Sequence, residues 1–185
     1  MAVPSNMLAL GTQAPDFNLK DVTSDQYIPL SSFQDKISLL VVFACRHCPY
    51  VKHGQNQLAQ IGKDYQDKSI SIVAISSNDP ASYPEDAPVS LKEQAEEIDF
   101  TFPYLFDETQ AVAKAYQAAC TPDFFLFDQD RKLVYRGQMD DSRPGNNIPV
   151  TGRDLRAAIE AVLNNQEVNP NQKPSLGCSI KWKER

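Results

Sequence analysis

The stretch ISLLVVFA, residues 37–44, constrains the fold most, because this largely apolar run leads directly into Cys45 and Cys48. An apolar run rich in β-branched residues is typical of a strand buried on both faces of a sheet. A similar run at 69–76 follows a segment, 49–67, whose apolar residues recur at helical spacing. Strand, helix and strand in this order predict a right-handed parallel crossover, with the cysteines where the helix begins.

The rest of the chain predicts further elements around this crossover. Three prolines interrupt residues 78–90, so we expect an ordered surface loop at the carboxyl edge of the sheet. A helix is predicted to follow, opened by a capping box from Ser90 to Glu93. Residues 123–137 contain two apolar runs joined by DQDRK, which predicts an antiparallel hairpin. Asp140 and Asp141, just after it, are predicted to lie in a solvated loop.

Length and charge restrict the class of protein. The 185 residues predict one domain, 1–185, with a core at about 10–165 and a tail at 166–185. The tail contains the only tryptophan, so we expect it to pack on the domain. A net charge of −6 argues against nucleic acid or an anionic membrane as a partner. The apolar runs are too short to cross a bilayer, and the start of the chain does not resemble a secretory signal. We therefore expect a cytoplasmic protein, whose oligomeric state the sequence does not specify.

A pair of cysteines two residues apart in a reducing compartment is typically catalytic or metal-binding. The strand-to-helix junction predicts that Cys45 lies at the helix N-terminus, where backbone amides and the macrodipole favour a thiolate. Arg46 and His47 add positive charge between the cysteines. We therefore predict that Cys45 is the low-pKa thiol, and that the pair is more oxidising than one with Gly-Pro between the cysteines.

The order of buried strand, CxxC, helix, strand and CTPDFFLFDQDRKLVYRG resembles the thioredoxin fold. The opening LGTQAPDFNLKD is similar to that of peroxiredoxins and membrane-anchored thioredoxins. Four further segments resemble a peroxiredoxin-like (AhpC/TSA-related) thioredoxin family, in the order HCPYVKH, YPEDAP, CTPDFFLFD and GCSIKWK. The resemblance implies a thioredoxin-like α/β fold: a central mixed β-sheet flanked by helices, with an N-terminal extension and a packed C-terminal tail. It also implies that Thr121 and Pro122 form a cis-proline loop that faces the CxxC and lines the substrate groove.

This resemblance implies a thiol–disulfide oxidoreductase with an antioxidant or redox-regulatory role. Cys45 would attack a substrate disulfide, and Cys48 would then attack Cys45 and release the reduced substrate. The expected partners are a protein or low-molecular-weight disulfide and a thiol reductant, and no cofactor is expected. Thioredoxins also bury an acid in the strand before the CxxC, whereas residues 37–44 contain none, so a proton relay must differ or be absent.

Two other functions remain open from the sequence. The first is a thiol peroxidase that uses Cys48 or Cys45 as the peroxidatic cysteine. The peroxiredoxin signature Pro-x-x-x-Thr-x-x-Cys, aligned on Cys48, places Val41 and Cys45 at its Pro and Thr positions. These departures weaken the peroxidase hypothesis, although Arg136 could match the second-strand arginine of peroxiredoxins. The second is a non-catalytic redox sensor or binding module.

Two further cysteines are candidate auxiliary redox thiols. Cys120 lies two residues before Pro122, so it is expected near the CxxC, and Cys178 in the tail is its candidate partner. The alternative is that Cys120 is a buried, inert residue. A zinc site is not expected, since structural zinc usually requires a second close ligand pair. The ligand sets considered were Cys45, Cys48, Cys120 and Cys178, or His47 and His53.

Overall fold

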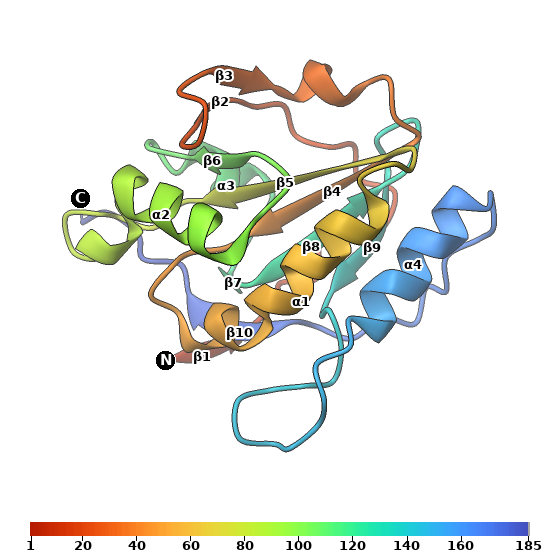
Figure 1. The fold of residues 1–185 in the computed structure, drawn as a ribbon. Helices are drawn as coiled ribbons and strands as arrows, with labels where there is room; N and C mark the ends of the chain where they lie inside the picture. The colour runs from red at the N-terminus through yellow and green to blue at the C-terminus, as the bar shows by residue number, and fades with distance from the viewer. Residues whose placement is uncertain (185) are drawn as a thin grey trace.

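The computed structural model describes residues 1–184 as two β-sheets with helices packed around the larger one (Figure 1). The larger sheet has the strand order β3-β2-β6-β5-β4-β8-β9, and the smaller has the order β1-β10-β7. The strands are β1 (Ala2–Pro4), β2 (Asn18–Asp21), β3 (Tyr27–Pro29), β4 (Ser38–Phe43), β5 (Ile70–Ser76), β6 (Tyr104–Phe106), β7 (Cys120–Thr121), β8 (Asp123–Phe127), β9 (Leu133–Gly137) and β10 (Leu176–Ser179). The α-helices are α1 (Pro49–Tyr65), α2 (Pro88–Ile98), α3 (Ala111–Ala115) and α4 (Arg153–Leu163), and two 3-10 turns are η1 (Leu30–Phe33) and η2 (Pro84–Asp86).

The predicted crossover is the centre of the larger sheet. Every residue of β4 is buried, and β4 runs parallel to β5 from the pair Ser38↔Ile70 to the pair Phe43↔Ile75. Strand β8 pairs with the other edge of β4 in the antiparallel direction and forms the predicted hairpin with β9. The fold class predicted from the sequence is therefore confirmed. None of the helices within residues 1–184 is long and apolar enough to cross a membrane.

The side chains of β4 alternate between two apolar clusters, as the period of two in a strand requires. Leu40 and Val42 pack on the side of α1 and α4, whereas Val41 and Phe43 pack on the side of α3 and η1. The ribbon shows α1 and α4 side by side on one face of the sheet, with α3 behind it (Figure 1). A strand covered on both faces has little freedom to shift, so the residues that follow it are held rigidly.

The C-terminal tail packs on the domain as an ordered strand. Strand β10 lies between β1 and β7 in the smaller sheet, and Ile180, just beyond it, is buried. Gly177 allows β10 to lie against the loop after β7, because a Cβ atom there would lie 1.9 Å from the Thr121 carbonyl oxygen. The tail is thus pressed directly onto the segment predicted to line the substrate groove.

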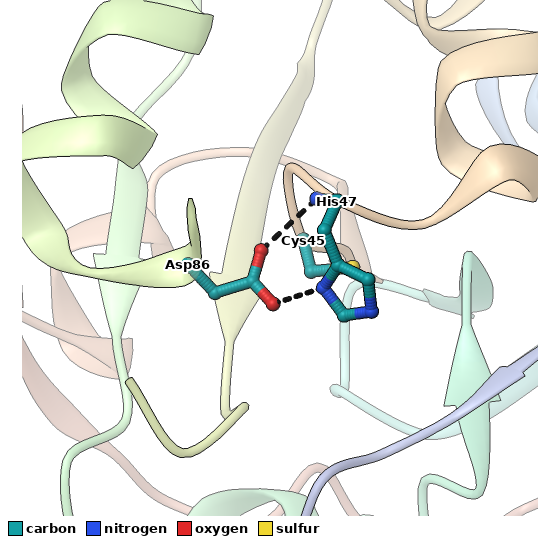
Figure 2. A group of neighbouring side chains, drawn as sticks. All are labelled: Cys45, His47 and Asp86. Atoms are coloured by element: carbon teal, nitrogen blue, oxygen red, sulfur yellow. Dashed lines mark hydrogen bonds and ion pairs between the residues drawn. The ribbon is translucent and has the colours of Figure 1, made fainter. Parts of the chain in front are cut away.

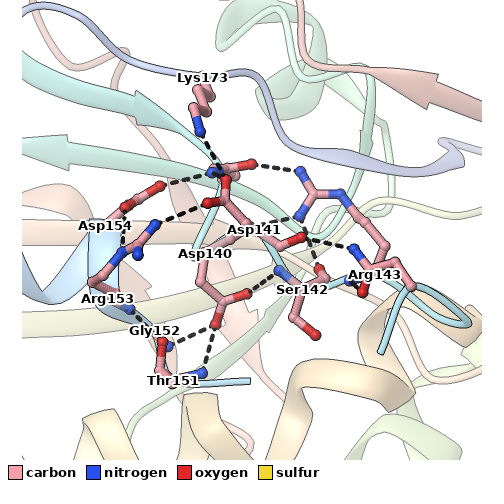
Figure 3. A network of polar contacts seen from close by, with 11 residues as sticks. Asp140, Asp141, Ser142, Arg143, Thr151, Gly152, Arg153, Asp154 and Lys173 are labelled. Carbon is pink, nitrogen blue, oxygen red and sulfur yellow. Dashed lines mark hydrogen bonds and ion pairs between the residues drawn. The ribbon is translucent and has the colours of Figure 1, made fainter. Parts of the chain in front are cut away.

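Two local predictions are wrong. Helix α2 begins at Pro88, with Ala87 as its N-cap, so Ser90 and Glu93 lie inside the helix and form no capping box. Proline at the first helical position accounts for the earlier start. Asp140 is buried, not solvated, and its carboxylate accepts hydrogen bonds from the backbone amides of Ser142, Thr151 and Gly152 (Figure 3).

Figure 3 also shows how the neighbouring Asp141 joins this loop to the tail. The Asp141 carboxylate pairs with Arg153 at 2.8 Å and with Lys173 at 3.0 Å. The guanidinium of Arg143 donates to the carbonyl oxygens of Asp140 and Ser142. Two carboxylates therefore hold the loop between β9 and α4 in place. Asp140 bonds to the backbone of the loop, and Asp141 joins the loop to the tail.

A buried carboxyl at the start of β8 makes stability depend on pH. Asp123 is 1% exposed, and within residues 1–184 neither carboxylate oxygen has a hydrogen-bond partner. Burial raises its pKa from 3.8 to about 7. The folded state thus holds a proton that the unfolded state loses above pH 3.8. The contribution of Asp123 to the free energy of unfolding therefore falls as the pH rises from 3.8 to about 7.

We expect the substitution Asp123→Asn to remove this loss of stability at higher pH. The free energy of unfolding of the variant, relative to wild type, should increase by about 2–4 kcal/mol between pH 4 and pH 7. Urea denaturation at several pH values measures the difference, with the exposed Asp130→Asn as a control that should show no such increase. A relative stability that does not change across this range would contradict the prediction.

Candidate dithiol active site

The two cysteines lie at the carboxyl end of β4, where the sheet passes the chain to α1. The side chains of Cys45 and Cys48 are both fully buried, and both are free thiols. Cys48 is the N-cap residue of α1, and Pro49 occupies the first helical position. Proline there fixes the start of the helix directly after Cys48, so the unpaired amides of the first turn surround Cys48 and not Cys45.

The loop between β7 and β8 faces this pair, as the resemblance implied. The Thr121–Pro122 peptide bond is cis. The Thr121 hydroxyl oxygen lies 3.4 Å from the Cys45 sulfur, and the Thr121 carbonyl oxygen lies 3.3 Å from the Cys48 sulfur, from which it accepts a hydrogen bond when Cys48 is protonated. Thr121 therefore contacts both sulfurs of the pair.

The predicted order of acidity in the pair is wrong. The pKa of Cys48 is lowered to about 4, first by a hydrogen bond from the Cys45 thiol, and further by Cys178, Thr121 and the backbone amide of Val51. The pKa of Cys45 is raised well above its usual value because its thiol donates to Cys48, is buried and lies near Asp86. The directions of the two shifts favour Cys48 over Cys45 as the thiolate. The physical reason is the set of groups around Cys48, with Cys45 first among them, whereas the sequence prediction considered only the helix N-terminus and placed Cys45 there.

A carboxylate from the Pro-rich loop holds the CxxC turn in place (Figure 2). Asp86 is fully buried and accepts hydrogen bonds from the backbone amides of Arg46, at 2.8 Å, and His47, at 3.1 Å. Its second oxygen bonds to the His47 ring and to the Asn78 amide. Asp86 was not among the residues predicted from the sequence. The sequence did contain a signal for it, because Asp86 is an acidic residue in a loop that was predicted to lie at the carboxyl edge of the sheet.

Arg46 and His47 have a different role from the predicted tuning of a thiolate. The Arg46 guanidinium turns away to α2, where it pairs with Glu93 at 2.7 Å and Glu97 at 3.2 Å. The His47 ring bonds to Asp86 and stacks on Tyr83, with ring centroids 4.8 Å apart. Both side chains therefore fasten the CxxC turn to the loop and to α2.

Cys45, His47 and Asp86 lie close enough together to be considered as ligands of a metal ion. Their ligand atoms all lie within 4.8 Å of one another. Sulfur, imidazole nitrogen and carboxylate oxygen are donors that suit zinc. The Asp86 oxygens, however, already accept the four hydrogen bonds described above, so a metal ion would have to displace the contacts that hold the turn.

The extra cysteines point to opposite faces of the smaller sheet. In the antiparallel register Cys178 lies opposite Thr121, and Ser179 lies opposite Cys120. Residues directly opposite share a face and neighbours in a strand alternate, so Cys178 faces the CxxC with Thr121 while Cys120 faces away. The predicted Cys120–Cys178 partnership is therefore wrong. Cys178 packs instead against the apolar cluster that contains Cys45 and Cys48, and it helps to lower the pKa of Cys48.

Arg136 and His53, two further residues considered from the sequence, are accounted for by their contacts. The Arg136 side chain bonds to the Leu8 carbonyl oxygen and to the Gln172 amide oxygen, at 2.8 and 2.9 Å. The His53 ring bonds to the Ser142 hydroxyl on the loop after β9. Arg136 is thus engaged with the N-terminal segment and the tail, and His53 with a neighbouring loop.

A central mixed sheet, a buried dithiol at the end of its middle strand and a facing cis-proline loop define a redox protein of the thioredoxin class. Residues 10–136 match the model of the AhpC/TSA family, and the chain belongs to this family. The family predicted from the sequence is confirmed.

Known proteins share this architecture. The thiol-disulfide oxidoreductase ResA of Geobacillus thermodenitrificans is 27% identical over 128 residues, 68% of this chain and 67% of ResA. The crystal structure of an uncharacterised conserved protein from Geobacillus kaustophilus covers 100% of this chain and 98% of that one, at 54% identity and a TM-score of 0.98. The thioredoxin domain of a thiol-disulfide oxidoreductase from Bacteroides vulgatus shares the fold, with 22% identity, a TM-score of 0.59, and coverage of 71% of this chain and 89% of that domain.

The assignment of the thiolate can be tested by titration of the reduced protein. Thiolate absorbance should show one cysteine with a pKa of about 4, and this signal should be lost in Cys48→Ser. Cys45→Ala should raise the pKa of Cys48 by about two units, because it removes the main hydrogen-bond donor. Cys45→Ser, whose hydroxyl can still donate, should raise it less.

Cys120→Ala serves as the control and should leave the titration unchanged, because Cys120 lies on the other face of the smaller sheet. If the acidic thiolate persisted in Cys48→Ser and disappeared in Cys45→Ser, Cys45 would be the thiolate and the assignment would be incorrect.

Proposed function

We propose that this thioredoxin-fold thiol–disulfide oxidoreductase uses Cys48 as its attacking thiolate and Cys45 as its resolving thiol. The observation that carries the proposal is the position of Cys48 as N-cap of α1, beside Cys45, Cys178 and Thr121, which lower its pKa. A thiolate is the nucleophile in disulfide exchange, and hydrogen bonds from nearby donors hold it ionised at neutral pH.

The exchange would proceed in two balanced steps. The Cys48 thiolate attacks one sulfur of the substrate disulfide, forming a mixed disulfide and releasing the other substrate sulfur as a thiolate. Cys48 then no longer carries a negative charge, so the Cys45 thiol loses the hydrogen bond and the charge that had raised its pKa. Cys45 gives up its proton and attacks the Cys48 sulfur, which releases the second substrate thiol and leaves a Cys45–Cys48 disulfide.

The low pKa of Cys48 also bears on redox poise. Stabilising the thiolate stabilises the reduced form of the pair, and this makes its disulfide a stronger oxidant. The prediction of a relatively oxidising pair is therefore kept, but the stabilising groups are Cys45, Cys178, Thr121 and the helix N-terminus, in place of Arg46 and His47.

The proposed partners are protein or low-molecular-weight disulfides and a thiol reductant, in an antioxidant or redox-regulatory role. Support comes from the relatives named as thiol-disulfide oxidoreductases. A reducing compartment such as the cytoplasm is proposed on the ground that four cysteines in a chain of 185 residues do not amount to a disulfide scaffold.

A peroxidase function is the second candidate, favoured by one observation. Cys48 combines a lowered pKa with a place just before Pro49 at a helix start, and an acidic, hydrogen-bonded thiolate is the form that peroxide oxidises. Arg136, the predicted counterpart of the peroxiredoxin arginine, bonds to Leu8 and Gln172 instead.

The proposal can be tested by trapping a mixed disulfide. Because Cys178 also contacts Cys48, the trapping variant combines Cys45→Ser with Cys178→Ser, and its matched control combines Cys48→Ser with Cys178→Ser. Incubated with insulin or with a cell extract, the first variant should hold substrate covalently at Cys48, and the control should trap about a hundredfold less.

Mass spectrometry of non-reduced peptides identifies the trapped sulfur. Trapping at Cys45 in the control, with none at Cys48 in the first variant, would overturn the proposed order of attack. A parallel assay with hydrogen peroxide addresses the second candidate. A sulfenic acid at Cys48 that forms before any disulfide, together with peroxide turnover, would favour the peroxidase.

A further inference from the structure

The CxxC of this protein lies beneath the protein's own tail strand in the described conformation. Both sulfurs belong to fully buried residues, whereas Cys178 on β10 is only partly buried. Strand β10 pairs with β7 and thereby occupies the backbone edge of Thr121 that the resemblance assigns to a substrate chain. The tail of the protein itself therefore lies where an extended substrate would pair.

The fit of β10 in this place is close. Gly177 lies against the Thr121 carbonyl so tightly that a Cβ atom would approach this oxygen to 1.9 Å. The same carbonyl oxygen lies 3.3 Å from the Cys48 sulfur. The next residue, Cys178, lies directly opposite Thr121 and packs against the cluster that contains Cys45 and Cys48.

We propose that Cys178 is a third redox thiol of this site, held by β10 as an internal substrate, which exchanges the Cys45–Cys48 disulfide for a Cys48–Cys178 disulfide. The inference rests on the proposed oxidoreductase function. The exchange moves the oxidised sulfur from a fully buried position to the partly exposed strand, where a thiol reductant can reach it.

Atoms and electrons balance in this exchange. Cys178 loses its proton and attacks the Cys48 sulfur, the Cys45–Cys48 bond breaks, and Cys45 leaves and takes up a proton. A dithiol reductant then attacks the Cys178 sulfur and releases Cys48 as a thiolate, which is the best leaving group in the cluster. The second thiol of the reductant frees Cys178, so the reductant ends as a disulfide and all three cysteines are reduced.

The electrostatics of the cluster suit the order of these steps. In the reduced protein the pKa of Cys178 is raised to about 11, by burial and then by its hydrogen bond to Cys48 and the charge of Cys48. Once Cys48 is oxidised these last two causes are gone, while Lys181 still favours the Cys178 thiolate. Cys178 therefore becomes a better nucleophile when there is a disulfide for it to attack.

The contrast with Cys120 shows that position, and not the mere presence of a thiol, carries the inference. Cys120 lies one residue before Thr121 and is also buried, but it faces the opposite side of the smaller sheet. Burial, the first cause, raises its pKa above the ordinary range. Cys120 is thus the natural control for Cys178.

Disulfide mapping in the full-length protein tests the exchange. Cys45→Ser, oxidised with diamide, should form an intramolecular Cys48–Cys178 disulfide, and so should Cys45→Ser combined with Cys120→Ala. Cys45→Ser combined with Cys178→Ser should form no intramolecular disulfide. A Cys45→Ser protein in which Cys48 stays free, or pairs only between molecules, would overturn the inference.

A kinetic measurement tests the role in turnover. Oxidised wild type and Cys178→Ser are each mixed with excess reduced thioredoxin, and the loss of the disulfide is followed by quenching and alkylation. Cys178→Ser should be re-reduced about tenfold more slowly than wild type, while Cys120→Ala should match wild type. Equal rates for wild type and Cys178→Ser would overturn the role of Cys178.

Failure of this inference is distinguishable from failure of the proposed function. Reduced wild type, mixed with excess insulin in a single turnover, reports the attack on a substrate disulfide and does not depend on how the protein is re-reduced. Loss of insulin reduction would sink the oxidoreductase proposal, whereas insulin reduction without a Cys48–Cys178 disulfide in Cys45→Ser would sink only the exchange.

Discussion

The hydrogen bonds that converge on the Cys48 sulfur are the interaction on which the site depends. A fully buried thiolate is costly unless donors replace the water it has lost. Here the groups that lower the pKa of Cys48 come from three different parts of the chain: Cys45 from the turn after β4, Cys178 from the tail strand and Thr121 from the cis-proline loop. Each of these segments has to be held in place for the thiolate to exist, and much of the surrounding structure does this.

The turn after β4 is held from the side by a single carboxylate. Asp86 binds the backbone amides of Arg46 and His47, and Arg46 in turn pairs with Glu93 on α2. The Asp86 charge also raises the pKa of Cys45. The same residue therefore fixes the geometry of the turn and keeps Cys45 protonated, so that it can serve as a donor to Cys48.

The tail strand links the fold to the redox chemistry. Strand β10 joins the N-terminal strand β1 to the cis-proline loop, so both ends of the chain contribute to the active-site region. In a dithiol protein with an open groove, the backbone beside the proline is available to substrates. In this protein that backbone is paired internally, which makes the tail either a barrier to substrates or a participant in the exchange. The contact between Cys178 and Cys48 favours participation.

The sequence by itself determined the central crossover, the hairpin and the place of the dithiol. Residues 37–44 can be buried only as an interior strand, and a helix with cysteines at its start has to follow. Motif order also indicated the cis-proline loop that faces the pair. The crossover and the hairpin follow from local patterns of apolar residues and turn residues, whereas the cis-proline loop was implied by the family resemblance.

Only the tertiary structure decided which thiol is acidic and which cysteines meet. Helix α1 begins at Pro49, where the predicted segment 49–67 begins, but the groups that lower the pKa of Cys48 are first Cys45 and then Cys178 and Thr121, which come from segments far apart in the chain. The register of β10 against β7 turns Cys178 toward the pair and Cys120 away. A register shift of one residue would reverse the two cysteines, because successive side chains in a strand alternate between faces. Long-range pairing sets this register, and the local sequence of the tail does not encode it.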